Sequence, residues 1–390
     1  MGIKVALVSQ ILAHYREPII RLLCEQEGDV QFTFFADPYN TINSVETIDA
    51  TKAGLPLNQG GLRWRFVKNI RLWGNWIWQR DILRLAVSND YDTVIYMGDI
   101  HYISTWISCL LARICGKRTL MWSHGFLREE KGLKGCVRSI FYRLAHGMLL
   151  YGDRARDIMV KKGFDPRRLY VVYNSLDYER QSQIRNSVTE PQIKELRGQL
   201  FRKPDMPILL FIGRLTAQKR LDMILYAAHL LRENGLECNL LFVGDGLEKK
   251  HLEALAIELK LSKTIYFHGC CYCEKEIAPL IMASDLCVAP GEVGLTAIHA
   301  LTYGTPVITH NAADCQMPEY EAIIPGKCGA FFKRNDITDL AHTIHKWLKN
   351  KSDLKSVLQA SRGVVESKYS PRAQLNVIIN AIKAEQEKVR

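Results

Sequence analysis

Short apolar runs alternate with amphipathic stretches along the first half of the chain. The amphipathic stretches predict helices at Glu17–Cys24, Trp76–Val87, Tyr102–Cys115, Cys136–Ala145 and Arg154–Lys162. The apolar runs between them predict strands at Val5–Val8, Gln31–Phe35, Thr93–Met97, Thr119–Trp122, Met148–Tyr151 and Leu169–Val172. Strands that alternate with helices are typical of a parallel sheet covered on both faces. The segment 37–63 has dispersed Asn, Gly, Thr and Pro residues and predicts a long loop.

The same alternation restarts after a polar stretch at 179–207, where no strand is predicted. Strands are expected at Ile208–Ile212, Asn239–Val243, Thr264–Phe267, Leu286–Ala289 and Val307–Thr309. Helices are expected at Leu221–Glu233, Leu247–Leu259, Glu276–Met282 and Leu295–Tyr303, then at 336–348, at 352–367 and after Pro371. Ligands of such sheets bind at the carboxyl ends of the strands. We therefore expect an α/β protein with two doubly wound, Rossmann-like domains that face a central cleft.

The domain boundaries follow from this pattern and from the length of 390 residues, which is long for a single core. We expect an N-terminal domain at 1–185 and a C-terminal domain at 186–370. A last helix is expected at 371–390.

Composition and cysteine usage favour a cytoplasmic protein. The chain is 47% apolar and 24% charged, as in globular proteins, and its longest apolar segment, Ile100–Ala112, is too short to span a bilayer. Met1–Val8 reads as a first strand and not as a signal peptide. The eleven cysteines are an odd number scattered through apolar segments, which favours free thiols. Cys270, Cys271 and Cys273 lie close together near His268, but no second ligand pair follows, so no metal is expected.

The net charge of +11 is unevenly placed. Residues 52–143 hold 15 Lys and Arg against 6 Asp and Glu, together with Trp64, Trp73, Trp76, Trp78, Trp106 and Trp122. Basic residues interleaved with tryptophans suit nucleic acid or an anionic bilayer surface. No nucleic-acid fold signature is present, so we expect a membrane surface and no nucleic acid as partner. A solvated basic face with its tryptophans in the core is the alternative.

Candidate chemistry lies at the ends of the strands of the second domain. Gly213 permits a turn after the first of these strands, and Arg214 and Lys219 offer a guanidinium fork and a point charge that suit a diphosphate. Gly244 and Gly246 follow the next strand, but Lys249 stands where a dinucleotide fingerprint has its third glycine, which disfavours a dehydrogenase. After Leu286–Ala289 a turn with glycines leads into a helix, and helix N-termini bind anions.

Together these motifs resemble retaining glycosyltransferase family 4, whose members have the GT-B fold and use nucleotide-sugar donors. The resemblance is close over about 205–335, through Gly213-Arg214…Lys219, Gly244-Asp245-Gly246 and the turn and helix from Gly294 to Pro306. It is looser in the first half, where it rests on His14-Tyr15-Arg16, Ser123-His124-Gly125 and Asn174–Asp177.

The resemblance implies that the last helix, 371–390, crosses back to the first domain, and it also implies roles for these residues. Arg214 and Lys219 would stabilise the leaving diphosphate together with the helix N-terminus at Gly294, Leu295 and Thr296, so no metal or other cofactor is expected. His124 would meet the transferred sugar near its reacting carbon, although a core histidine after a strand is the plainer interpretation. Further donor contacts would come from Gly213, Gly244, Gly246 and the segment 270–274, and acceptor contacts from His14, Tyr15 and Arg16.

The chain departs from the family at two positions. The family has two glutamates eight residues apart, and this chain has Gly291 and His299 there. Glu292 can take the first role if the backbone is shifted, and His299 can hydrogen-bond a ribose in the second role. The change predicts a donor sugar with an altered hydroxyl pattern, such as a deoxy or amino sugar.

The function expected from the resemblance is a retaining transferase of the hexosyl or deoxyhexosyl type, peripheral at the inner face of the membrane. Its partners would be a nucleotide sugar and a lipid-linked glycan acceptor in cell-surface polysaccharide synthesis. Two alternatives stay open, namely a catalytically silent sugar-nucleotide-binding or scaffold protein and a sugar-nucleotide epimerase of the same fold.

Overall fold

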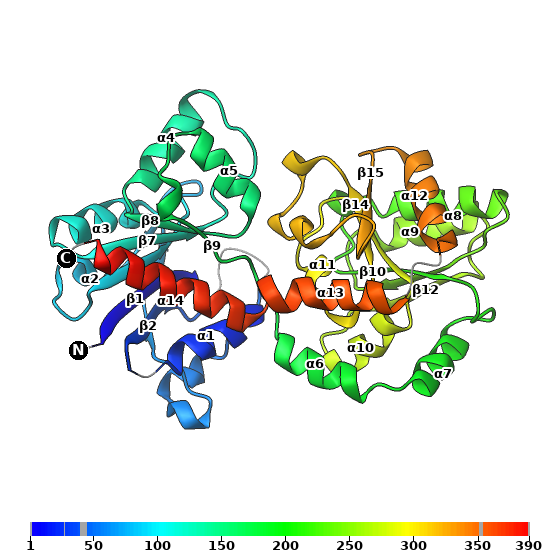
Figure 1. Ribbon diagram of the computed structural model, residues 1–390, viewed down its shortest axis with the longest axis horizontal. Coiled ribbons are helices and arrows are strands. Elements are labelled where there is room, and N and C mark those ends of the chain that lie inside the picture. The colour runs from blue at the N-terminus through cyan, green and yellow to red at the C-terminus, as the bar shows by residue number, and fades with distance from the viewer. Residues whose placement is uncertain (1, 27, 40–44, 351–353, 389–390) are drawn as a thin grey trace. The chain divides into compact units, whose positions relative to one another are not determined.

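The computed structural model describes residues 2–26, 28–39, 45–350 and 354–388, and the chain divides into two compact units (Figure 1). Unit 1 comprises Met1–Leu176 and Ser370–Arg390, and unit 2 comprises Asp177–Tyr369. The first boundary therefore precedes the predicted one at 185/186. The reason is that the polar stretch 179–207 is mostly helical and packs on unit 2, where Arg185 Nη1 donates to Thr302 O at 2.6 Å.

Among its described residues, unit 1 holds a sheet of seven parallel strands in the order β3-β2-β1-β6-β7-β8-β9. The chain runs outward from β1 to β3 and then returns to place β6 beside β1, so the strand order reverses between β1 and β6. The strands are β1 (Ile3–Ile11), β2 (Val30–Asp37), β3 (Trp64–Phe66), β6 (Thr93–Met97), β7 (Arg118–Ser123), β8 (Gly147–Leu150) and β9 (Leu169–Val171).

Helices cover both faces of this sheet. Val5 and Leu7 of β1 pack in one apolar cluster with α1 (Glu17–Cys24) and α14 (Pro371–Glu387), and Ala6 and Val8 pack in another on the opposite face. This alternation is the period of two that a strand requires. The second cluster includes residues of α2 (Ile82–Val87), α3 (Ile103–Ile114), α4 (Gly132–Arg143) and α5 (Asp153–Lys161).

The C-terminal helix α14 belongs to unit 1 and runs alongside α1 (Figure 1). Its Gln374 donates through Nε2 to Tyr173 O at 2.8 Å and accepts from Ser175 Oγ at 2.8 Å. Near the other end, Glu385 accepts from Tyr170 OH at 2.9 Å. These bonds join the last helix to the strand β9 and the segment that follows it.

Unit 2 holds six parallel strands within its described residues, in the order β12-β11-β10-β13-β14-β15. The strand order reverses between β10 and β13. The strands are β10 (Ile208–Ile212), β11 (Asn239–Val243), β12 (Ile265–Gly269), β13 (Leu286–Ala289), β14 (Val307–His310) and β15 (Gly329–Phe332).

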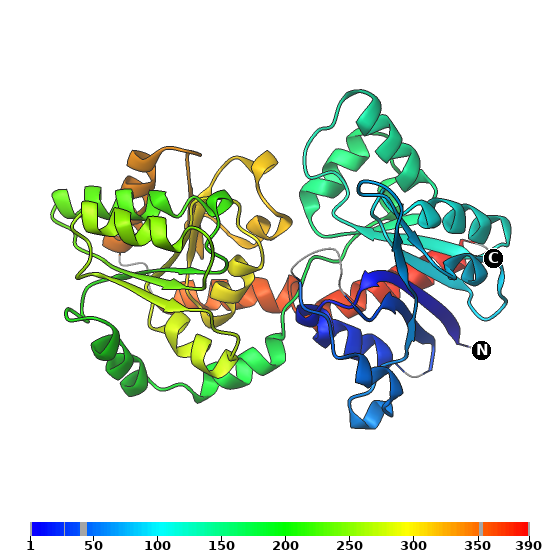
Figure 2. The same cartoon turned by 180° about the vertical axis from the view of Figure 1, so that it is seen from behind.

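Figures 1 and 2 show helices on both faces of this second sheet. One face carries α8 (Asp222–Glu233), α9 (Lys249–Glu258) and α12 (Ile337–Lys349). The other carries α6 (Tyr178–Ser187), α7 (Glu190–Leu200) and α10 (Glu274–Met282). The remaining helices are α11 (Leu295–Tyr303) and α13 (Leu354–Lys368), which pack on each other. The two sheets confirm the predicted α/β class with two doubly wound, Rossmann-like halves.

Several local predictions were wrong. The stretch 76–87 is not one helix, because Ile77–Gln79 forms β5, paired with β4 (Asn69–Arg71), and Asp81 has a φ of 69° before α2 begins at Ile82. The edge strands β3 and β15 were not predicted. In the predicted loop 37–63, 3₁₀ turns form at Ala50–Gly54 and Leu57–Gln59, while 40–44 lie outside the described residues. Among the described residues, no helix has the length and apolar character needed to cross a membrane.

Candidate functional site

The reversal of strand order in unit 2 brings together the loops that follow β10 and β13. Gly291 N, after β13, donates to Lys219 O at 3.0 Å, and Thr296 Oγ1 donates to Ile212 O at 2.9 Å. A Cβ on Gly291 would lie 2.1 Å from Gln218 O, so only glycine fits there. In open α/β sheets such a reversal is the place where ligands bind.

The loop after β11 packs against the loop after β10 just as closely. Gly244 has a φ of 145°, and a Cβ on it would lie 1.9 Å from Gly213 O. Two residues further on, a Cβ on Gly246 would lie 2.2 Å from Leu215 O. The glycines predicted as donor contacts, Gly213, Gly244 and Gly246, thus lie together at the carboxyl edge of the sheet.

Lys219 points back to the turn after β13. Its Nζ donates to Glu292 O at 2.9 Å and lies 3.5 Å from Glu292 Oε1. The Lys219 side chain is mostly buried, whereas Arg214 at the end of β10 is exposed. The structure therefore brings Lys219 and Glu292 into one ion pair beside the start of α11.

Helix α11 begins with Gly294 as its N-cap. No side chain caps this end by a hydrogen bond, and no acidic residue stands in its first turn. The backbone N–H groups of Leu295 and Thr296, the first two residues of the helix, have no intrahelical acceptors, whereas Ala297 N donates to Gly294 O at 2.9 Å. An anion at this end would accept from them and would also be attracted by the helix dipole.

His299 lies one turn further along α11, in a cluster that the sequence did not predict. Its Nε2 is 2.7 Å from Glu274 Oε1, and the same oxygen accepts from Tyr303 OH at 2.6 Å and from Gln181 Nε2 at 3.3 Å. Glu274 comes from the first turn of α10. In the sequence, only the expected contribution of segment 270–274 to the donor site pointed to Glu274 as a member of this cluster.

The balance of effects on Glu274 favours its charged form. Burial acts to raise the pKa of this carboxyl, but the hydrogen bond and the attraction of His299, with the bonds from Tyr303 and Gln181, lower it below its usual value. The pKa of Tyr303 is raised by burial and by the neighbouring carboxylate. The cluster therefore holds a negative charge beside His299 over the neutral pH range.

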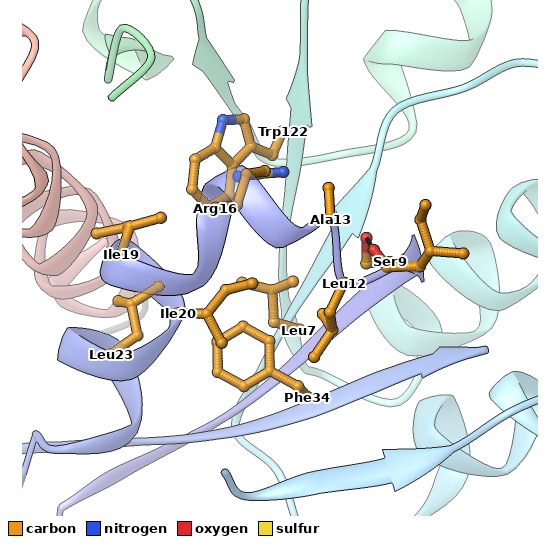
Figure 3. A pocket seen from close by; sticks show the side chains of 11 residues that line it. Leu7, Ser9, Leu12, Ala13, Arg16, Ile19, Ile20, Leu23, Phe34 and Trp122 are labelled. Atoms are coloured by element: carbon orange, nitrogen blue, oxygen red, sulfur yellow. Dashed lines mark hydrogen bonds between the residues drawn. The ribbon is translucent and has the colours of Figure 1, made fainter. Parts of the chain in front are cut away.

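The predicted residues of unit 1 lie at the carboxyl ends of β1 and β7. His14 and Tyr15 are exposed, and Arg16 lies over the indole of Trp122, with its Cζ 4.1 Å from the ring centroid (Figure 3). His124 packs on Tyr151, the two ring centroids being 4.5 Å apart. Burial, and then the charge of Arg16, lower the pKa of His124 to about 4. His124 is therefore a neutral imidazole at neutral pH.

The basic, tryptophan-containing segment differs in part from its prediction. Trp64 and Trp122 are buried, and of its six tryptophans, all of which the structure describes, only Trp73 is exposed, at 67%. All eleven cysteines are described and are free thiols. Within the described ranges, no group of three or more His, Cys, Asp or Glu side chains is placed to hold a metal ion.

Residues 192–364 match the family described as Glycosyl transferases group 1. Among curated proteins, an alpha-D-kanosaminyltransferase from Streptomyces kanamyceticus is 30% identical over 173 residues, which is 43% of each chain. An alpha-monoglucosyldiacylglycerol synthase from Streptococcus pneumoniae is 29% identical over 240 residues, 60% of this chain and 48% of that protein. The chain thus matches less than half the length of either relative.

Similarity to solved structures extends over nearly the whole chain. Anabaena Alr3699/HepE in complex with UDP superimposes with a TM-score of 0.72 over 98% of this chain and 100% of that one, at 16% identity. An identity this low shows the fold alone. Residues 192–364 are therefore similar to the glycosyl transferases group 1 family, and the fold of the chain is the predicted GT-B fold.

Proposed function

We propose that the protein is a retaining glycosyltransferase of family 4 that moves a sugar from a nucleotide-diphosphate donor to a glycan acceptor. The observation that carries the proposal is the convergence, at the strand-order reversal of unit 2, of Lys219, Arg214 and the uncapped start of α11. Two cations and a helix N-terminus at one sheet edge suit a diphosphate. UDP in the solved complex of the Anabaena protein supports a nucleotide donor.

In this reaction the acceptor hydroxyl attacks the anomeric carbon while the bond from that carbon to the diphosphate oxygen breaks. The new glycosidic bond forms on the face that the diphosphate leaves. The acceptor proton passes to a phosphate oxygen of the leaving group, so no carboxylate base is needed. Lys219, Arg214 and the first N–H groups of α11 stabilise the charge that develops on the diphosphate. These fixed donors take the role that a metal ion has elsewhere, and we expect no metal requirement.

The donor pocket is proposed to use Glu274 and His299 as a unit. His299 stands where the family has a glutamate, and Glu274 Oε1 lies 2.7 Å from its Nε2. The carboxylate that is missing from α11 is thus supplied from α10, behind the histidine. We propose that His299 contacts the ribose and that Glu292, paired with Lys219, lies toward the sugar. A hexosyl or deoxyhexosyl donor with an altered hydroxyl pattern remains our prediction.

An exposed apolar surface on unit 1 favours a lipid-linked acceptor. We define the α3–α4 surface by Ile107, Leu110 and Ile114 of α3 and Leu133, Val137 and Ile140 of α4, all of them exposed. The two helices are in contact, since the rings of Trp106 and Phe141 lie 4.7 Å apart. Residues 103–143 carry eight Lys and Arg against two Asp and Glu. Apolar side chains among basic ones suit the inner, anionic face of a membrane.

The test is to incubate the full chain with a panel of nucleotide sugars and lipid-diphosphate acceptors. We expect release of free nucleoside diphosphate together with a glycosylated acceptor. Lys219→Ala or Arg214→Ala should lower the rate by at least about 100-fold, as loss of a charge-stabilising donor does. Lys249→Ala, which removes the same charge at the start of α9, is the control and should retain activity.

The alternatives predict different products. An epimerase would interconvert sugar nucleotides without net release of nucleoside diphosphate and without glycosylating an acceptor. A silent scaffold would bind a donor and turn over none of it. If no sugar nucleotide binds, the proposal that the protein is a glycosyltransferase is wrong.

A further inference from the structure

Arg16 lies at the strand-order reversal of the unit 1 sheet, just as the proposed diphosphate-binding loops lie at the reversal of the unit 2 sheet. It follows β1, and the strand order of its sheet reverses between β1 and β6. Its guanidinium lies against side chains from the ends of two further strands, with Cζ 4.1 Å from the Trp122 ring centroid and Nη1 3.7 Å from Met97 Sδ. Arg16 therefore projects over the carboxyl edge where ligands of such sheets bind.

Three polar nitrogens at this edge are buried and have no hydrogen-bond partner, namely Arg16 Nε, Trp122 Nε1 and His124 Nδ1. The Trp122 side chain is only 1% exposed. Trp122 and His124 are two residues apart and both pack on Tyr151, at centroid distances of 6.1 and 4.5 Å. Leaving a buried donor unpaired is unfavourable, and such groups are unusual in folded proteins. Three of them at one ligand-binding edge indicate a bound acceptor of hydrogen bonds.

Arg16 brings a positive charge to this edge. Within the described ranges, no carboxylate forms an ion pair with Arg16, whose guanidinium contacts the indole face of Trp122 and the sulfur of Met97. Figure 3 shows the guanidinium lying across the indole, above an apolar pocket lined by residues such as Leu7, Ile20 and Phe34. The apolar lining offers no counter-charge from below. An indole N–H and a guanidinium can only donate, so the missing partner is a hydrogen-bond acceptor and not a cation, and the charge of Arg16 favours an anionic acceptor.

We propose that Arg16, Trp122 and His124 form a phosphate subsite in unit 1, in which the guanidinium, the indole N–H and the His124 Nδ1–H donate to oxygens of a phosphate ester. Arginine held flat on an aromatic ring keeps its planar fork oriented for phosphate. The contacts within unit 1 alone support the existence of the subsite. Its assignment to a ligand of sugar transfer, either the donor diphosphate or a phosphate of the acceptor, rests on the proposed function.

The probe is inorganic pyrophosphate, and the protein is the full chain carrying Lys219→Ala. This background substitution weakens the proposed phosphate contacts of unit 2, so that binding in unit 1 can be measured. The ring signals of His124, assigned with His124→Gln, are followed by NMR through a pH titration. Bound pyrophosphate should raise the pKa of His124 by about 1, because a nearby negative charge favours the imidazolium. Calorimetry on the same samples gives the affinity.

Arg16→Gln should abolish this pKa change and weaken pyrophosphate binding at least tenfold. Trp122→Phe should keep the aromatic face and weaken binding to a smaller degree. The matched control is Arg21→Gln, which removes the same charge from the exposed side of α1 and should change neither quantity. Sodium acetate at equal ionic strength should not reproduce the effect. The proposal is overturned if Arg16→Gln binds as the background does, or if acetate acts as pyrophosphate does.

Two further experiments, on the chain with Lys219 intact, identify the molecule that supplies the phosphate. If saturating UDP alone raises the pKa of His124, the subsite takes the donor diphosphate. If a lipid-diphosphate acceptor raises it in the presence of UDP, the subsite takes the acceptor. Failure of every donor in the transfer assay, with the pyrophosphate effect intact, would contradict the proposed function and leave the subsite standing.

Discussion

Glu274 accepts hydrogen bonds from His299, Tyr303 and Gln181 through one carboxylate oxygen, and it is the residue on which the inner part of the candidate donor site depends. All four side chains come from helices that pack on the same face of the unit 2 sheet. A carboxylate in this position both orients the imidazole of His299 and keeps a negative charge beside it.

Glu274→Gln is therefore predicted to destabilise unit 2 in a pH-dependent way. The pKa of Glu274 is lowered in the folded chain, so the stability it contributes is present above its usual value of 4.5 and is lost as the pH falls below that value. At pH 7 the variant should lose about 1.5–3 kcal/mol, the range for hydrogen bonds to a charged group. Thermal denaturation from pH 7 to pH 3.5 measures the difference, which should shrink in acid.

Glu276→Gln is the control for this prediction. Glu276 stands in the same turn of α10, is exposed and accepts only a weak bond from Cys271 Sγ at 3.4 Å. Its replacement should change stability little at any pH. A constant deficit of Glu274→Gln across the whole pH range would show that the cluster acts through packing and not through charge.

At the scale of elements, the candidate donor site consists of loops that touch through their backbones. Gly244 and Gly246 face Gly213 and Leu215, and Gly291 faces Gln218, with no room for a side chain at any of these contacts. Strands β10, β11 and β13 are neighbours in the sheet, so their turns must pass one another at its edge. The glycines therefore set how closely the cations and the start of α11 approach.

Gly244→Ala should disrupt this arrangement. The new Cβ would lie 1.9 Å from Gly213 O at a φ of 145°, so the backbone must move. We expect a loss of stability of about 1–3 kcal/mol and weaker binding of UDP. Chemical denaturation and calorimetry measure the two effects.

Gly198→Ala is the matched control, because Gly198 lies on the exposed side of α7 with open space around it. That change should raise stability by about 0.5–1 kcal/mol, since alanine favours a helix, and leave UDP binding unaltered. Equal effects of the two substitutions would contradict the role given to the Gly244 contact.

At the scale of the whole molecule, the proposed membrane contact is narrower than the basic, tryptophan-containing segment 52–143 from which it was predicted. Trp64 and Trp122 belong to the core of unit 1, and the exposed apolar area of this unit includes α3 and α4. Ile114 and Leu133 are the most exposed residues of the α3–α4 surface, at 72% and 81%. Basic side chains such as Arg113 and Lys134 are exposed on the same helices.

The double variant Leu133→Ser and Ile140→Ser should weaken binding to vesicles at least about tenfold, given the apolar area that each side chain would bury. Flotation with vesicles of phosphatidylcholine, with and without phosphatidylglycerol, measures it. Binding should need the anionic lipid and should fall in 1 M salt, where charges are screened within about 3 Å.

Ile257→Ser removes an equally exposed apolar residue, at 70%, from α9 of unit 2 and serves as the control. It should leave vesicle binding unchanged. Equal loss from both variants, or none from either, would show that the α3–α4 surface is not the membrane contact.

The hydrophobic pattern by itself determined the fold class and the position of most elements. Buried parallel strands must be nearly continuous apolar runs, and the helices between them must be amphipathic, so both kinds of element leave a local record. Ile208–Ile212, Asn239–Val243 and Leu286–Ala289 are strands with the predicted bounds. The chain order of glycines and cations after these strands was enough to place a candidate diphosphate site on their carboxyl ends.

Only the tertiary structure decided which distant groups meet. The polar stretch 179–207 was expected to hold the domain boundary. Its helices α6 and α7 have few buried residues but belong to unit 2, where Arg185 and Gln181 bind partners about a hundred residues away. Edge strands such as β15 have too short an apolar run to stand out. The pairing of Glu274 with His299 and the stacking of Arg16 on Trp122 depend on the order of strands in each sheet. Strand order is a property of packing and leaves no local trace in the chain, so both contacts had to be observed.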